Sequence, residues 1–276
     1  MSILRVNHNI SAMNTQRNLD ATSFNLSKSL QKLSSGFRIN TAADGPADLV
    51  ISEGLRSQIG GIKAALRNTQ ESANLLSIAE GALNEVSNLL STLKALAVHA
   101  LNRGVVSQSQ MNADQAELTR AISSINRIGL ATRFAGGTVF TAAVRRFQIG
   151  EGTGGGDSVN LAIGSLTATA LSLAGLTVSG TSALAVSALR KVSAAIASVA
   201  TRRGVLGAFI KNTLQTNINS LSVALENITA TESYIRDTNM AEETSEYTKN
   251  QILVQAGVSV LAQANVASQS VLALLR

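Results

Sequence analysis

Apolar residues recur in the same rhythm near both ends of the chain. In each region successive positions are separated alternately by four and three residues, which places their side chains along one narrow seam of an α-helix. A helix of about twenty residues is marginal alone in water, so each seam needs a partner, either the other end of the chain or another molecule. The seam positions are Leu19, Ser23, Leu26, Leu30, Leu33 and Phe37 at the start and Val254, Val258, Leu261, Asn265, Ser268, Leu272 and Leu275 at the end. Their apolar members are the candidate self-assembly residues.

Helical periodicity also fills most of the chain between these seams. It predicts a first helix over about residues 8–35, ended by Gly36, which suits a C-cap. A second helix starts near Pro46, since proline is tolerated in the first turn, and runs to about residue 102 with one slip of phase after Leu76. A helix of some 55 residues would span roughly 80 Å, so a rod is expected here.

Three further helices are expected, and the breaks between helices predict the domain organisation. The helices cover about residues 109–128, 182–236 with a break near Gly204 and Gly207, and 243–276. We expect a terminal segment at each end that pairs with the other, and a central domain of long helices between them. The predicted domains are residues 1–45, 46–235 and 236–276.

Residues 130–178 have a different pattern, which predicts a small β region. Gly136-Gly137 indicates a hairpin turn. Residues 146–149 are expected to form a strand, and the alternation over 159–163 predicts a half-buried second strand. The glycine-rich stretch 150–158 is expected to be a flexible turn.

Two features of this region invite other interpretations. Gly150, Gly152 and Gly155 match G-x-G-x-x-G, but a dinucleotide site needs a helix directly after the turn, and a strand is predicted there instead. Residues 158–189 carry no charge, which raises the question of a membrane span. Glycines interrupt this run, and its Ser and Thr residues make it less apolar than a membrane-spanning helix. We therefore expect a buried β-element and no membrane insertion.

Composition excludes several kinds of chemistry. The chain has 276 residues, no cysteine and 2 histidines, which lie far apart with no carboxylate spaced to complete a metal site. Aromatic residues make up 3%, whereas a compact enzyme usually places more aromatic area in its core and pocket. Because no nucleophile elbow, phosphate loop, zinc-metalloprotease motif or calcium loop occurs, we predict no catalytic residues, no cofactor and no metal.

Charge and the first residues narrow the choice of partners and compartment. The net charge of +6 could suit nucleic acid, but the basic residues are scattered, and aromatic residues do not interleave with them as stacking platforms. A solvated basic surface and no nucleic-acid partner are therefore predicted. No apolar run follows the opening MSILRVNHN, so a signal peptide of the usual kind is not expected.

Long collinear motifs at both ends resemble those of bacterial flagellin, the subunit of the flagellar filament. The N-terminal half contains LRVNHNISAMNT, LSKSLQKLSSGFRINTAADGPADL, AEGALNEVSNLL and LKALAVHA, and the C-terminal part contains IRDTNMAEETSEYTKNQILVQAGVSVLAQAN and SQSVLALLR. The resemblance covers roughly residues 1–140 and 185–276. About 45 residues lie between the matching blocks, so this chain resembles a short form without the variable outer domains of larger members.

The resemblance implies a mainly α fold, with an antiparallel bundle or coiled coil of long helices, a small β-hairpin region and paired terminal helices. It also implies a non-enzymatic subunit that polymerises with copies of itself into the filament used in motility. Flagellins leave the cell through the type III export channel, which implies a secreted, extracellular protein. The implied partners are an export chaperone, the filament cap and the hook–filament junction proteins.

The family also implies a set of positions for contact with the innate-immune Toll-like receptor. Detected flagellins present an arginine, a leucine and a glutamate on their outer long helices. The leucine corresponds to Leu96 and the glutamate to Glu117, but the arginine position holds Thr92. A bidentate charged donor is thereby replaced by a short hydroxyl, so this contact set is incomplete.

Two alternative functions remain open at this point. The hook–filament junction protein of the same superfamily shares the terminal helices, although VLAQAN and SVLALLR are closer to flagellin. A membrane-active helical protein would use residues 158–189 as a hairpin that inserts into a bilayer. Polymerisation into filaments would separate the leading interpretation from this second alternative, and so would flotation of the monomer with liposomes.

Overall fold

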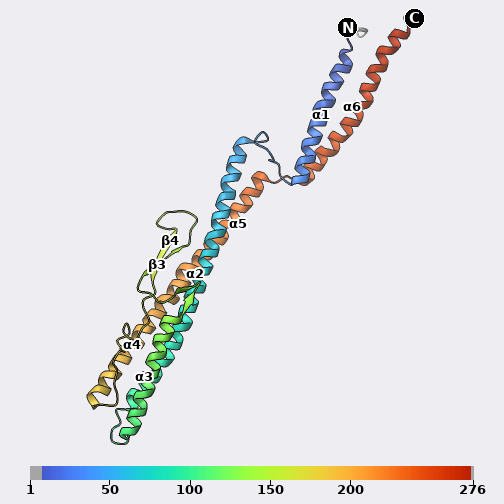
Figure 1. Cartoon of the computed structure of the whole chain (residues 1–276). Coiled ribbons are helices and arrows are strands. Elements are labelled where there is room, and N and C mark those ends of the chain that lie inside the picture. Colours follow the sequence, from blue (N-terminus) through green and yellow to red (C-terminus); the bar gives the residue numbers. More distant parts are fainter. Residues whose placement is uncertain (1–7, 275–276) are drawn as a thin grey trace. The chain divides into compact units, whose positions relative to one another are not determined.

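The computed structural model describes the backbone of residues 8–274 and the side chains up to residue 266 (Figure 1). It is mainly helical, with two small antiparallel strand pairs, as predicted. The chain divides into two compact units. Unit 1 consists of residues 1–57 and 227–276, and unit 2 consists of residues 58–226. The boundaries of these units lie inside long helices, whereas the predicted domain bounds near residues 45 and 236 lie between helices and stay a prediction.

In unit 1, the chain's first and last helices lie side by side and run in opposite directions (Figure 1). Helix α1 (Ile10–Ser35) starts at Asn9, whose side-chain oxygen accepts the N–H of Ala12 at 3.0 Å. It ends as predicted at Gly36, whose φ of 75° is the left-handed conformation that suits a C-cap.

Helix α6 (Met240–Leu274) begins three residues earlier than the sequence pattern predicts. The side-chain oxygen of Asn239 accepts the N–H of Ala241 at 3.2 Å, so an N-cap adds the missing turn. Just before it, the connection from α5 pairs with the connection that follows α1. The Arg38 N–H donates to the Arg236 carbonyl at 2.7 Å, and the Thr238 N–H donates to the Gly36 carbonyl at 2.9 Å. These bonds join the two chain segments directly.

Unit 2 is built from long helices that share one hydrophobic core. Helix α2 (Pro46–His99) is followed by α3 (Gln108–Ala131), whose first turn is closed by a reciprocal capping box between Ser107 and Gln110. The buried positions of α2 recur alternately every three and four residues without interruption, so the predicted slip after Leu76 is wrong. Ser52 and Leu75 are buried outside this series, which extends one residue past the end of α2 and consists of Ile62, Ala65, Thr69, Ser72, Leu76, Ala79, Leu83, Val86, Leu90, Leu93, Ala97 and Ala100.

The break predicted near Gly204 and Gly207 is also wrong, because α4 (Ser182–Phe209) continues through both glycines. A π-helical turn, η1 (Ile210–Gln215), leads directly into α5 (Thr216–Arg236). The stretch 182–236 is long and apolar enough to cross a membrane by length and composition. Its most apolar window is 28% buried. Some of its residues, such as Val192, Val199 and Leu214, line the core of unit 2 and are almost completely buried.

The predicted β region is present as two hairpins. Strands β1 (Arg133–Phe134) and β2 (Gly137–Thr138) are joined by Ala135 and Gly136, whose φ values of 48° and 82° suit a type I′ turn. Strands β3 (Val144–Gln148) and β4 (Ser158–Ala162) pair over five residues, with Arg146 opposite Asn160. The glycine-rich stretch between them is a loop, as expected.

Only the first residues of the uncharged run 158–189 are a strand, so the expected buried β-element is largely replaced by an irregular segment. This segment, which we call the strap (residues 163–180), covers the helical core with side chains such as Leu166 and Leu173. Amide side chains of α3 hold its backbone. Gln115 accepts from the Val178 N–H at 2.7 Å, and Asn126 accepts from the Ala168 N–H at the same distance. Helix side chains thus replace the strand partners that the strap lacks.

Candidate functional site

The facing sides of α1 and α6 are formed mostly by small or polar residues. Their buried and half-buried positions recur every three or four residues, as in a coiled-coil seam. On α6, Asn250 is buried, and Gly257 brings the backbone so near that an added Cβ would lie 3.1 Å from the Leu19 side chain. The facing positions are Ala12, Thr15, Leu19, Thr22, Leu26, Ser29 and Leu33 on α1, and Glu243, Tyr247, Asn250, Val254, Gly257, Leu261 and Ala264 on α6.

The predicted seam coincides with this facing side in part. Leu19, Leu26, Leu33, Val254 and Leu261 are half-buried on it. The other described members point away from it or lie beyond the helix. Leu30 is 56% exposed, Val258 53% and Phe37 37%. Leu275 lies outside the described residues, and so does the side chain of Leu272.

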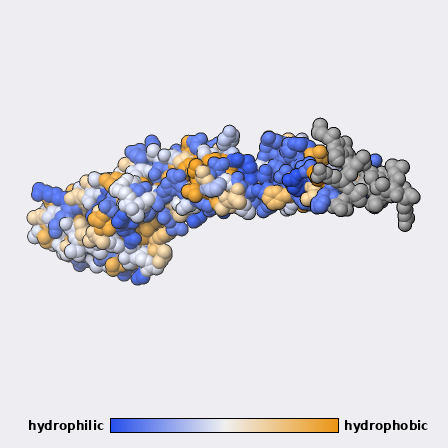
Figure 2. All heavy atoms as spheres, turned by 90° about the horizontal axis from the view of Figure 1, so that it is seen from above, coloured by the Kyte–Doolittle hydropathy of each residue, from blue (hydrophilic) through white to orange (hydrophobic). Residues whose placement is uncertain are grey.

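Larger apolar residues lie on the surfaces of α1 and α6 that face away from the pair. We call these surfaces the outer apolar faces. Apolar and hydrophilic residues are mixed on the visible surface (Figure 2). Exposed large apolar side chains that gather on one surface are candidates for contact with another protein. The outer apolar faces consist of Ile10, Met13, Phe24 and Leu30 on α1, and Ile252, Leu253, Val258, Val260 and Val266 on α6.

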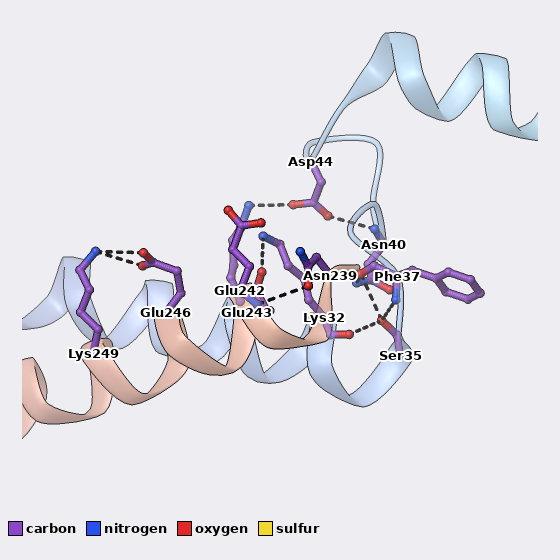
Figure 3. A network of polar contacts seen from close by, with 11 residues as sticks. Lys32, Ser35, Phe37, Asn40, Asp44, Asn239, Glu242, Glu243, Glu246 and Lys249 are labelled. Carbon is purple, nitrogen blue, oxygen red and sulfur yellow. Dashed lines mark hydrogen bonds and ion pairs between the residues drawn. The ribbon is translucent and has the colours of Figure 1, made fainter. Parts of the chain in front are cut away.

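Charged residues hold the turn between α1 and α2. The Lys28 ammonium donates to Asp44 at 2.8 Å, and the Thr41 amide and hydroxyl donate to the other Asp44 oxygen at 2.9 and 2.8 Å. These hydrogen bonds, that from Lys28 above all, keep the pKa of the Asp44 carboxyl far below its ordinary value. Lys32 on α1 and Glu243 on α6 form an ion pair at 3.3 Å (Figure 3).

A second group of contacts involves Arg236 at the end of α5. Its guanidinium donates to Glu53 at 3.0 Å and lies 4.7 Å from the centre of the Phe37 ring. Hydrogen bonds from Arg56 and then from Arg236 lower the pKa of the Glu53 carboxyl. Phe37, a predicted seam residue, therefore contacts a cation at this connection.

Beside these contacts lies a groove of about 810 Å³. Carboxylates predominate among the charged side chains of this groove, and most come from the first two turns of α6 and the residues before it. We call it the acidic groove. Its lining residues are Lys32, Arg38, Ser233, Tyr234, Asp237, Thr238, Asn239, Glu242, Glu243 and Glu246.

The three receptor-contact positions lie on α2 and α3 in unit 2. Thr92 and Glu117 are exposed, and Leu96 is half-buried against the hydrophobic core. The Thr92 hydroxyl donates to the Asn88 carbonyl of its own helix at 3.3 Å. Their role in recognition stays a prediction.

No group of three or more His, Asp or Glu side chains is arranged to hold a metal within the part of the chain that the structure describes. The described residues form packed helices, an acidic groove and exposed apolar faces. A chain with these features belongs to the class of structural proteins that assemble through long helices.

Comparison with known proteins identifies the family. Residues 6–144 match the bacterial flagellin N-terminal helical region, and residues 189–275 match the bacterial flagellin C-terminal helical region. Flagellin FlaB1 of Treponema pallidum (strain Nichols) is 35% identical, with 98% of this chain and 99% of that protein aligned. Flagellin of Bacillus subtilis (strain 168) is 39% identical, with 99% and 100% aligned.

The Treponema phagedenis flagellar filament 33 kDa core protein is 37% identical over 98% of this chain and 99% of its own length. The crystal structure of Bacillus cereus flagellin superposes with a TM-score of 0.49 at 25% identity, covering 56% of this chain and 88% of that one. The chain belongs to the bacterial flagellin family. It is a structural subunit of the flagellar filament that self-polymerises, and it is not an enzyme.

Proposed function

We propose that the chain polymerises through the outer apolar faces of α1 and α6, with the facing sides of the two helices holding each other within one subunit. The observation that carries this proposal is the distribution of side chains in unit 1. Half-buried aliphatic residues lie between the two helices among small and polar ones, whereas Phe24, Leu30 and Val258 are 62%, 56% and 53% exposed. Burying such side chains is worth about 1.5–3 kcal/mol each, so contact between subunits through these residues would be favourable.

The predicted seam residues then take two roles. Leu19, Leu26 and Leu33 would set the pairing of α1 with α6 inside the subunit. Leu30 and Val258 would contact neighbouring subunits. This division agrees with the three-four spacing, because a helix can present two adjacent apolar stripes of the same period.

The finer partners and the location are also proposals. Family membership supports a secreted protein that works outside the cell in the flagellum. It likewise supports contacts with an export chaperone, the filament cap and the hook–filament junction proteins. Thr92, Leu96 and Glu117 are proposed as the positions where a Toll-like receptor would meet unit 2, with Thr92 lacking the cation that strengthens this contact in detected flagellins.

Replacing Leu30 by Glu tests the main proposal. We expect Leu30→Glu to raise the critical concentration for polymerisation by at least about tenfold, because a carboxylate would be buried without a partner at every subunit contact. Critical concentrations are measured by sedimentation of seeded filaments, with negative-stain electron microscopy of the pellets. Asn88→Glu, which adds the same charge at an exposed position of α2 in unit 2, is the control. Equal critical concentrations for the two variants would contradict the proposal.

A further inference from the structure

The charged residues of this chain are strongly segregated along the sequence. Residues 158–225 contain no Asp or Glu but several cations, among them the exposed neighbours Arg190 and Lys191 on α4. Residues 232–246 have the opposite character, since Arg236 is their only basic residue among several carboxylates. One segment therefore carries unbalanced positive charge and the other unbalanced negative charge.

Within the acidic groove, the cations are already engaged. Lys32 pairs with Glu243 at 3.3 Å, and Arg38 pairs with Asp48 at 3.4 Å while also donating to the Ile235 carbonyl. Figure 3 shows Lys32 directed at Glu243. Glu246, another lining carboxylate, pairs with Lys249 at 3.1 Å. Glu242 and Asp237 are therefore the lining carboxylates without an ion pair among the residues that the structure describes.

Several acceptors of the groove remain available for a ligand. The Glu242 carboxylate is exposed and makes no hydrogen bond or ion pair with any side chain that the structure describes. Asp237 accepts only the Ser233 hydroxyl, at 2.6 Å. The Thr238 hydroxyl is buried and has no partner among the described residues. An acceptor that is withdrawn from water and left unpaired costs free energy, which a donor from outside could relieve.

An aromatic ring completes this surface. Tyr234 lines the groove and is 88% exposed, far more than is usual for an aromatic side chain. A ring beside carboxylates is a favourable surface for a guanidinium or ammonium group, which can stack on the ring and pair with the acids together. The chemistry of the groove therefore fits a cationic side chain.

We propose that the acidic groove binds the Arg190–Lys191 pair on α4 of a second copy of this chain. The argument for a second copy is charge complementarity, because α4 provides exposed cations in a segment without any carboxylate. The interaction deepens the proposed self-assembly and rests on it. The groove would fix the orientation of neighbouring subunits, while the outer apolar faces supply most of the binding free energy.

Charge reversal on each side of the proposed contact tests it. Glu242→Lys and Lys191→Glu are each expected to raise the critical concentration about three- to tenfold at about 50 mM salt, since an ion pair becomes a like-charge contact. At about 500 mM salt the difference from the wild type should shrink, because exposed charges are screened. The double variant, which restores opposite charges, is expected to polymerise within about twofold of the wild type.

Glu226→Lys is the matched control, because it makes the same charge change at an exposed position of α5 outside the groove. Far-ultraviolet circular dichroism of each monomer checks that the helices remain formed. The proposal is overturned if Glu242→Lys behaves like Glu226→Lys, or if the double variant is as impaired as the two single variants combined. Failure of the wild type to polymerise would instead refute the proposed function itself.

A cross-linking experiment adds an independent readout. Filaments grown from a mixture of ¹⁴N- and ¹⁵N-labelled subunits are treated with a carbodiimide, which joins carboxylates to lysines in direct contact. Mass spectrometry should find Glu242 joined to Lys191 in pairs of mixed isotope. Links from Glu242 only to lysines of unit 1, such as Lys28 or Lys249, would contradict the assignment of α4 as the occupant.

Discussion

At the scale of single residues, Asp44 shows how much of a connection can depend on one carboxylate. Its oxygens accept from Lys28 on α1 and from the amide and hydroxyl of Thr41, which fixes the turn between α1 and α2. From the sequence, Asp44 looks like part of a helix start before Pro46. Its distant partner Lys28 could not be predicted, because that contact depends on how the chain turns after Gly36.

Replacing Asp44 by Asn tests this role. A carboxyl whose pKa is lowered by folding contributes stability above its unfolded pKa, which is ordinarily 3.8, and loses it as pH falls toward the folded value. We therefore expect Asp44→Asn to be less stable than the wild type by about 1–3 kcal/mol at pH 7. The difference should narrow steadily as pH falls below about 4.

Thermal unfolding of both proteins between pH 7 and pH 2 measures this difference. Asp20→Asn, at an exposed position of α1, is a suitable control for loss of a charge. A difference in stability that does not change with pH would show that the charge on Asp44 is not the cause.

At the scale of elements, the helices could be predicted closely, but their irregularities could not. The starts and ends of α1, α2 and α3 fall within a few residues of the expected positions, since caps and apolar spacing determine them locally. The expected slip of phase in α2 is absent. The helical irregularity that the structure does contain is the π-helical turn η1, which lies between α4 and α5. Gly204 and Gly207 indicate a break, yet packing against the core keeps the helix continuous there. Tertiary burial thus overrides local propensity.

The π-turn has a simple interpretation in terms of register. A π-turn holds one residue more than the same turn of an α-helix. In a regular α-helical seam, a step of three and a step of four bring a buried position back after seven residues. The buried Leu206 and Leu214 are eight residues apart, which is one residue more. The extra residue therefore keeps Leu214 of η1 on the side that faces the core, in line with the buried residues of α4.

Deleting one residue from the π-turn should consequently be tolerated. Removing exposed Lys211 would convert η1 into an α-helical turn and keep both flanking faces in register, with a cost of roughly 1 kcal/mol or less. Removing exposed Ser222 from α5 would rotate all later residues by about 100° and displace half-buried side chains such as Leu225 and Ile228, at a cost of several kcal/mol.

Urea unfolding of the two deletion variants compares these costs, with circular dichroism as the probe. If both deletions destabilise the chain equally, η1 does not act as a correction of register. A crystal structure of the Lys211 deletion variant would show directly whether the turn becomes α-helical.

At the scale of the whole molecule, the division into two units has a direct consequence for truncation. Residues 254–276 belong to unit 1, and the core of unit 2 contains none of them. We expect a chain that ends at residue 253 to fold in unit 2 but to form no filaments, because the outer apolar face of α6 loses Val258, Val260 and Val266.

Thermal unfolding of the truncated chain should retain the transition of unit 2, and sedimentation should find no polymer after seeding with wild-type filaments. Filaments of normal length would contradict the assignment of unit 1 to assembly. Loss of the unit 2 transition would contradict the independence of its core.

The arrangement within unit 1 was only partly predictable from the sequence. The three-four spacing correctly indicates two paired terminal helices, but it does not determine which stripe faces the partner helix. Leu30 continues the apolar spacing, yet Ser29 is the buried residue beside it. The facing side is selected by how closely two backbones can approach, which favours small residues such as Gly257. The sequence pattern ranks the larger side chains first, so it adds the exposed Leu30 and Val258 to residues such as Leu26 that do lie on the facing side.

The loop between β3 and β4 is a position where a foreign peptide could be inserted. Its ends are held together by the strand pairing and by the Ile149 and Gly150 N–H groups, which both donate to the Asp157 carbonyl. An added side chain at Gly155 or Gly156 would meet no atom within 4 Å. Lengthening a closed loop costs little, about 0.6 kcal/mol for each doubling. A foreign peptide grafted between these two glycines would therefore be carried by every subunit, which makes this loop a natural attachment point for displaying epitopes or enzymes in a dense, regular array.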